Sequence, residues 1–143
     1  MEQKVKNHKT RRVYREEIIS VIYPFELQDI KLDSNKIFDD FDLDNQQIKT
    51  IEFIEKHYDF FKNIIIPFLS ENSNWNKIKP LIRSILLLGV FELNYLDKKI
   101  VINEFVEITK DFTLKGDKDF KLVNAILDKV SKYYEENLTN SKN

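Results

Sequence analysis

The stretch DFKLVNAILDKV, residues 119–130, has the periodicity of an amphipathic helix. At about 100° per residue, its large apolar side chains fall on one side of the helix. These side chains, with the tyrosine that follows them, are Leu122, Val123, Ile126, Val130 and Tyr133. Phe120 lies at the edge of this apolar face, close to Lys121 and Asn124. An edge that combines an aromatic ring, a cation and an amide can serve either packing or ligand binding.

Periodicity near 3.6 recurs along the rest of the chain, which has only two glycines and three prolines to build turns. It predicts helices over about residues 10–27, 35–41, 45–65, 80–95, 98–114 and 119–137. Pro24 is expected to kink or end the first helix, Asp97 to cap the fifth, and Gly116 to end it. Asp117 or Asp119 is expected to cap the last helix. The sequence therefore predicts an all-α protein.

Two residues are expected to matter for packing. Gly89 lies inside the most apolar predicted helix, where a glycine costs about 0.5–1 kcal/mol relative to alanine. Close approach of a second helix is the expected reason for it. Trp75 follows the polar loop at residues 70–74 and is expected to anchor the core or one end of the bundle.

Composition excludes several classes of protein. The chain is 42% apolar and 33% charged, which is typical of a globular protein. It has no cysteine, so disulfides and thiolate zinc sites are impossible. Its longest apolar run, residues 85–91, is too short to span a bilayer. The N-terminus is basic without an apolar segment, so no secretory signal is expected and we predict a cytoplasmic protein.

Catalytic arrangements are scarce. The two histidines, His8 and His57, fit no metal-binding spacing, and HExxH and GxSxG motifs are absent. With glycines only at positions 89 and 116, no phosphate-binding glycine loop is possible. We therefore predict that the protein is not an enzyme and has no metal and no cofactor.

Charge is unevenly distributed although the net charge is only −1. Residues 1–15 hold six basic residues against one glutamate, a net of +5, whereas residues 29–59 hold nine carboxylates against four lysines, a net of −5. Such asymmetry favours a flexible basic arm at residues 1–9 that contacts an acidic partner. The alternative is a solvated tail with no partner.

Three arginines crowd the start of the first predicted helix. Arg11, Arg12 and Arg15 oppose the positive end of the helix dipole there, which favours a role outside helix stability. On a helical wheel Arg12 and Arg15 share one side with Ile19 and Tyr23, away from the core stripe of Tyr14, Ile18, Val21, Ile22 and Phe25. Guanidinium groups beside a tyrosine suit phosphates and a base. The alternative for Tyr23 is packing against the next helix.

The start of the last predicted helix offers the same chemistry. Lys118 and Lys121 can hold phosphates, Phe120 can stack on a base, and Asn124 can pair with a base edge. The alternatives are a peripheral core residue for Phe120 and a polar boundary residue for Asn124.

Glu104 is expected to be structural rather than catalytic. It flanks an apolar arc formed by Val101, Phe105, Ile108 and Phe112, while Asn103 points away from that arc. A carboxylate at a buried edge needs a partner, so we expect a cation from a neighbouring helix.

Four segments together resemble the NusB family of transcription antitermination factors. ILLLGVFEL (85–93), VINEFVEITKDF (101–112) and KLVNAILDKV (121–130) are similar to the family patterns ILRLAxYEL, INEAVELAK and FVNGVLD. RRVYREEIISVIYPFEL (11–27) resembles RRxARExALQALY, with Tyr23 at the tyrosine. The resemblance covers nearly the whole chain, but residues 29–59 match only in helical character.

The chain departs from the family pattern at four positions. Leu87 replaces the arginine of ILR, Leu122 the phenylalanine of FVNG, and Ala125 its glycine. Pro24 follows the tyrosine, where the family usually continues its helix. These departures concern local contacts more than the fold.

The resemblance implies a non-enzymatic, all-α single domain of about six to seven helices, arranged as two packed sub-bundles. It implies a domain at residues 10–137 and leaves residues 138–143 as a disordered tail. It also implies binding of boxA-type RNA together with the ribosomal protein NusE, within an antitermination complex on RNA polymerase. The implied RNA-binding residues are Arg11, Arg12, Arg15, Tyr23, Lys118, Phe120, Lys121 and Asn124, and Tyr23 and Leu27 are candidates for contact with the protein partner.

Two other functions stay open on the sequence. One is a helical protein–protein interaction module without affinity for RNA. The other is a stand-alone relative of the NusB-like domain that precedes the catalytic domain of ribosomal RNA cytosine methyltransferases.

Overall fold

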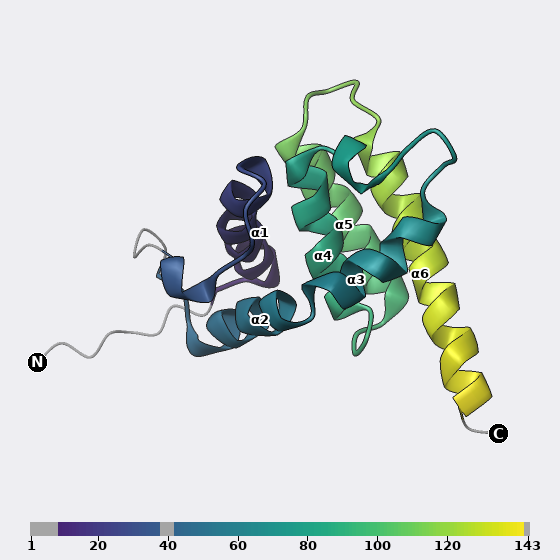
Figure 1. Ribbon diagram of the computed structural model, residues 1–143, viewed down its shortest axis with the longest axis horizontal. Helices are drawn as coiled ribbons and strands as arrows, with labels where there is room; N and C mark the ends of the chain where they lie inside the picture. Colours follow the sequence, from purple (N-terminus) through teal and green to yellow (C-terminus); the bar gives the residue numbers. More distant parts are fainter. Residues whose placement is uncertain (1–8, 38–41, 142–143) are drawn as a thin grey trace, which may run out of the picture.

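A computed structural model describes residues 9–37 and 42–141, which contain α-helices and short 3-10 turns and no strand (Figure 1). The α-helices are α1 (Arg11–Leu27), α2 (Asn45–Lys56), α3 (Tyr58–Ile65), α4 (Pro80–Glu92), α5 (Lys98–Phe112) and α6 (Asp119–Ser141). The 3-10 turns span Ser34–Lys36, Ile66–Phe68 and Trp75–Lys77. The all-α prediction is confirmed.

The helices lie in two groups, with α1 and α2 on one side of the molecule and α3 to α6 on the other (Figure 1). Helix α4 joins the groups because it packs against both α1 and α6, and α5 packs along α6. No helix of the described residues has the length and apolar character needed to cross a membrane.

Helix α1 begins and ends close to the predicted positions. The Thr10 hydroxyl caps it by accepting a hydrogen bond from the backbone N–H of Val13 at 3.1 Å. The predicted core stripe is buried throughout. Pro24 does not end the helix, which continues to Leu27. Asp29 follows with a φ of 55°, in the left-handed region that breaks helical geometry.

The predicted helix over residues 45–65 is in fact two helices that meet at His57. Asp44 and Gln47 form a capping box at the start of α2. The break lets Ile54 of α2 and Phe61 of α3 enter the same core, and this packing overrides the helical continuity that periodicity suggested. The helix predicted at 35–41 is only a 3-10 turn as far as the described residues show, and residues 38–41 lie outside them.

The packing roles of Gly89 and Trp75 are confirmed. A Cβ atom at Gly89 would lie 3.0 Å from one terminal methyl of Leu127 and 3.2 Å from the other. Glycine therefore permits the close contact of α4 with α6. Trp75 is buried, and its indole N–H donates to the Tyr58 hydroxyl at 3.3 Å.

The connection between α5 and α6 differs in detail from the prediction. Asp97 caps α5 as expected, since its carboxylate accepts from the N–H of Lys99 at 2.8 Å. Gly116 has a φ of +103°, but it lies in the loop beyond Thr113 rather than at the helix end. The Asp117 carboxylate accepts from the N–H of Leu114 within that loop, and Asp119 is the first residue of α6.

The buried face of α6 is rotated from the predicted one. Val123, Ile126, Leu127 and Val130 are buried, whereas Leu122 and Tyr133, which we placed on the apolar face, are exposed. Leu127 completes the stripe because α4 approaches closely at Gly89. Helix α6 also continues to Ser141, beyond the predicted helix end at residue 137.

Candidate nucleic-acid interface

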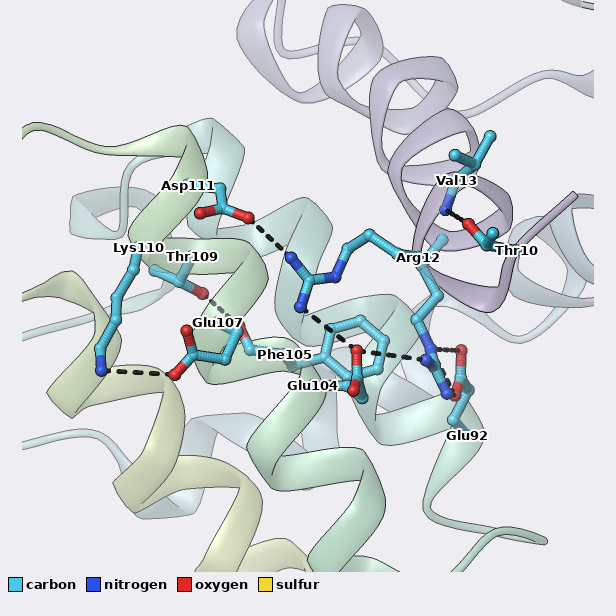
Figure 2. A network of polar contacts seen from close by, with 11 residues as sticks. Thr10, Arg12, Val13, Glu92, Glu104, Phe105, Glu107, Thr109, Lys110 and Asp111 are labelled. Carbon is cyan, nitrogen blue, oxygen red and sulfur yellow. Dashed lines mark hydrogen bonds and ion pairs between the residues drawn. The ribbon is translucent and has the colours of Figure 1, made fainter.

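Arg12 links α1 to α5 through two carboxylates (Figure 2). Its Nη1 donates to Asp111 Oδ2 at 2.6 Å, and its Nη2 lies 3.4 Å from Glu104 Oε2. The Nε of Arg12 is buried and has no hydrogen-bond partner among the described residues. Only part of this guanidinium is therefore available to a ligand.

Arg15 is a structural residue, contrary to the sequence prediction. Its side chain is almost fully buried. Its guanidinium donates hydrogen bonds of 3.0, 3.0 and 2.7 Å to the buried carboxylate of Glu92. It also lies 5.5 Å from the centre of the Phe105 ring. Ile19, on the same side of α1, is fully buried. This flank of α1 faces α4 and α5, so Arg15 cannot reach a phosphate without breaking its ion pair.

Glu104 has the structural role that the sequence predicted. Its carboxylate lies 3.4 Å from Arg12 and 3.8 Å from Arg15, so the partner cations come from α1 as expected. Asn103 is exposed, also as expected.

Arg11 is the most accessible of the three arginines. Its guanidinium lies 4.8 Å from the centre of the Tyr14 ring and 3.8 Å from the Glu92 carboxylate. The side chain is nevertheless about half exposed. Of the predicted arginine cluster, Arg11 and part of Arg12 can therefore meet an anionic ligand.

Lys9 is fixed rather than flexible. Its ammonium group pairs with Glu17 of α1 at 3.0 Å and donates to Gln47 of α2 at 2.7 Å and to the backbone carbonyl of Asp42. Lys9 thus has ordered contacts with α1 and α2, and the other residues of the predicted basic arm, 1–8, lie outside the described part of the chain.

The start of α6 presents the predicted edge to solvent. Lys118, Lys121 and Asn124 are exposed, and Phe120 is partly buried. The ammonium group of Lys110, on α5, lies 4.9 Å from the centre of the Phe120 ring. Phe120 therefore packs against its neighbours and also offers part of its ring to solvent, and its stacking on a base stays a prediction.

The last turn of α5 lies between the two groups of predicted residues. Asp111 is directed toward Arg12 of α1 (Figure 2). The ammonium group of the preceding residue, Lys110, lies over the ring of Phe120 of α6. Lys110 was not among the predicted residues, because the helical wheel of α5 alone does not show which neighbouring ring it meets. The last turn of α5 thus contacts both the start of α1 and the start of α6.

Tyr23 lies apart from the arginines. It is twelve positions after Arg11, about 18 Å along the helix axis. It is half-buried and lines a cavity of about 360 Å³ with Leu81 of α4 and Leu114 of the α5–α6 connection. Leu27, one turn further on, is exposed. Tyr23 therefore lies further along α1 than the arginines, and its role in RNA binding stays a prediction.

Lys79 was also missed by the sequence analysis. Its ammonium group lies 3.0 Å from Asp119 Oδ2, and the hydrogen bond that it donates to this carboxylate raises the pKa of Lys79. Both side chains border the cavity beside Tyr23. Within the described ranges, no three histidine, aspartate or glutamate residues are grouped so as to hold a metal ion.

The six helices and the charged edges of α1, α5 and α6 define a small all-α protein with a surface suited to binding. The sequence model of the NusB family matches residues 12–132. The chain belongs to the NusB family.

Relatives of similar length support this assignment. The chain is 33% identical to the transcription antitermination protein NusB of Nitratiruptor sp., over 86% of this chain and 92% of the relative. It is also 33% identical to the protein of the same name from Campylobacter jejuni, over 86% of this chain and 96% of that relative. A solved structure of T. maritima NusB is similar in fold, with a TM-score of 0.72, 24% identity, and coverage of 87% of this chain and 92% of that one. The resemblance seen in the sequence motifs is confirmed, and the relatives are named for antitermination rather than for catalysis.

Proposed function

We propose that this protein is a transcription antitermination factor of the cytoplasm that binds boxA-type RNA together with NusE, in a complex on RNA polymerase. Family membership and the names of its relatives support the role in antitermination. The RNA and the partner are the ones that the family resemblance implies.

One observation carries the RNA-binding part of the proposal. The last turn of α5 contacts the start of both helices, because Asp111 accepts a hydrogen bond from Arg12 of α1 and Lys110 lies 4.9 Å from the centre of the Phe120 ring of α6. Cations supply phosphate contacts, whereas Phe120 and Asn124 supply a stacking surface and an amide for a base edge. The proposed RNA surface is formed by Arg11, Arg12, Lys110, Lys118, Phe120, Lys121 and Asn124.

This surface suits moderate rather than tight binding. Arg12 is shared with two carboxylates, Arg15 is withdrawn into the core, and Asp111 keeps a negative charge beside the surface. Few phosphates can be neutralised, so counterion release contributes only a limited affinity. A second RNA-binding protein would extend the contact, which is the role that we assign to NusE.

The region around Tyr23 is our proposed contact for NusE. Leu27 and Leu114 are strongly exposed apolar side chains near the two ends of this region, and Phe112 is also exposed. Exposed apolar residues beside a cavity are typical of a protein–protein contact. Because this region borders the start of α6 at Asp119, a protein bound there would lie next to the RNA surface.

The decisive experiment is titration of labelled boxA-type RNA with the protein, with and without NusE, across a series of salt concentrations. We expect moderate binding alone, tighter binding with NusE, and a linear loss of log affinity with log salt concentration. Scrambled RNA of equal length is the control for sequence preference. Equal RNA affinity with and without NusE would refute the cooperative part. If the protein bound NusE but bound no RNA under either condition, the protein–protein interaction module would be favoured instead.

A matched pair of variants tests the location of the surface. Lys121→Ala and Lys129→Ala remove the same charge from exposed positions of the same helix, but only Lys121 lies at the proposed surface. We expect Lys121→Ala to weaken RNA binding and reduce the salt slope by about one unit at most, with little change for Lys129→Ala. Equal losses in both variants would show that only net charge matters.

A further inference from the structure

A second concave surface lies between α2, α3 and the end of α4. It has a volume of about 640 Å³, which is within the usual range of ligand sites. We call it the aromatic groove. It is lined by Gln46, Lys49, Thr50, Phe53, His57, Phe60, Phe61, Phe91, Asn94 and Tyr95. Three of its aromatic side chains are largely open to solvent, with Phe53 45% exposed, Phe60 56% and Tyr95 54%.

The rings of the aromatic groove form a continuous series. The ring centre of Phe91 lies 5.4 Å from that of Phe53 and 5.3 Å from that of Tyr95. The His57 ring lies 4.3 Å from Phe53 on the other side. The apolar side chains that line the groove are all aromatic, which distinguishes it from the aliphatic grooves that receive amphipathic helices. Exposed rings in series provide surfaces on which planar groups stack.

The polar groups of the aromatic groove favour an anionic ligand. Lys49 lines it, and no carboxylate does so among the described residues. Glu55 of α2 is directed elsewhere, since it accepts hydrogen bonds from Ser34. The amides of Gln46 and Asn94 also border the groove, and amides can pair with base edges.

Arg11 connects the aromatic groove with the proposed RNA surface. The Arg11 guanidinium lies 3.8 Å from the carboxylate of Glu92, which precedes the groove residue Tyr95 by three positions in the sequence. The neighbouring Arg12 points to α5 and the RNA surface. A strand that crosses the start of α1 would therefore meet Arg11 before it reaches Tyr95.

We propose that the aromatic groove is a second binding site for single-stranded RNA, where bases flanking the boxA-type element stack on Tyr95 and Phe53 while Lys49 and Arg11 hold phosphates. This inference rests on the proposed RNA-binding function and extends it. Stacking of bases on aromatic side chains tolerates many sequences, so this site would lengthen the RNA contact without adding much sequence preference.

The test measures how affinity depends on RNA length. Fluorescence anisotropy compares a boxA-type RNA with the same RNA extended at either end by a short single-stranded oligouridine. We expect extension at one end to raise affinity at least about 5-fold, as one well-stacked base would. Tyr95→Ala should abolish this gain and leave binding of the short RNA unchanged, whereas Tyr95→Phe should keep the gain.

A matched control and a folding check make the result unambiguous. Tyr133→Ala removes another exposed tyrosine from α6, outside the groove, and should keep the gain. Thermal melting monitored by circular dichroism verifies that each variant is folded. Lys49→Ala should reduce the salt slope for the extended RNA only.

Each other outcome refutes the inference in a distinguishable way. If the short RNA binds but extension at either end adds nothing, the groove is not an RNA site and the proposed function still stands. The groove is likewise not an RNA site if the Tyr95→Ala variant keeps the gain in affinity on RNA extension. The same conclusion follows if this variant loses only its binding to a protein component such as NusE. If neither RNA binds, with or without NusE, the proposed function itself fails.

Discussion

The buried ion pair of Arg15 and Glu92 permits the sharpest stability prediction. Replacing Arg15 with methionine keeps the length of the side chain but leaves the Glu92 carboxylate, which is 1% exposed, without its principal cation. Breaking a buried pair from one side usually costs about 3–5 kcal/mol because the remaining charge is left uncompensated. We therefore expect a large loss of folding free energy from this single substitution.

The geometry sets the expected value within that range. The three short contacts between the guanidinium and the carboxylate indicate a well-formed charged pair. Arg11, at 3.8 Å from the same carboxylate, compensates part of the loss, so the lower end of the range, about 3 kcal/mol, is expected. For a chain of this size that corresponds to a fall in Tm on the order of 10 °C.

Urea denaturation followed by circular dichroism measures this free energy directly. Glu92→Leu alone and Arg15→Met with Glu92→Leu complete a double-mutant cycle. The double variant should be more stable than either single variant, since a buried pair replaced by apolar groups is often neutral or better. A loss below about 1 kcal/mol for Arg15→Met, or a double variant no better than the singles, would refute the structural role of this pair.

Three further predictions follow from the packing and the proposed surface. Gly89→Ala should destabilise the protein by about 1–3 kcal/mol in thermal melting, because the new Cβ meets buried Leu127 at 3.0 Å. Phe120→Ala, if folded, should weaken binding of boxA-type RNA more than binding of scrambled RNA, by roughly 1–3 kcal/mol. Burial raises the pKa of Tyr134 to about 12 from 10.0. The folded state therefore favours the protonated Tyr134 hydroxyl, and the stability that this preference contributes should be present below pH 10 and lost as pH rises to about 12. Tyr134→Phe should reduce this alkaline loss of unfolding free energy in urea titrations.

Each of these has a contradicting result. A Gly89→Ala variant as stable as the parent would show that Leu127 gives way at little cost. Leu122→Ala is the control for Phe120→Ala, because Leu122 is an exposed apolar residue of the same helix, and equal losses in both would remove the base-stacking role. If the Tyr134→Phe variant loses as much stability at alkaline pH as the parent does, the pH dependence comes from other tyrosines.

Local sequence patterns were sufficient for most of the helices and for several of their contacts. Periodicity identified most of the helical segments, and side-chain chemistry identified the cap at Asp97. Gly89 indicated a close helix contact because glycine has a known cost inside a helix. The motifs at residues 85–93, 101–112 and 121–130 indicated the family. All these features depend on residues that are near one another in the chain.

The accessible site residues were decided only by the tertiary structure. Arg15 and Arg12 are similar on a helical wheel, yet one is buried against Glu92 and the other is shared between Glu104 and Asp111. The carboxylates that pair with them lie 77 or more positions away in the sequence, so no local pattern predicts which arginine pairs with which carboxylate. The same reason applies to Lys110 over Phe120 and to the aromatic groove, whose rings come from three helices and a loop. Helix formation is governed by neighbours within a turn or two, whereas burial and ion pairing are governed by how the helices pack.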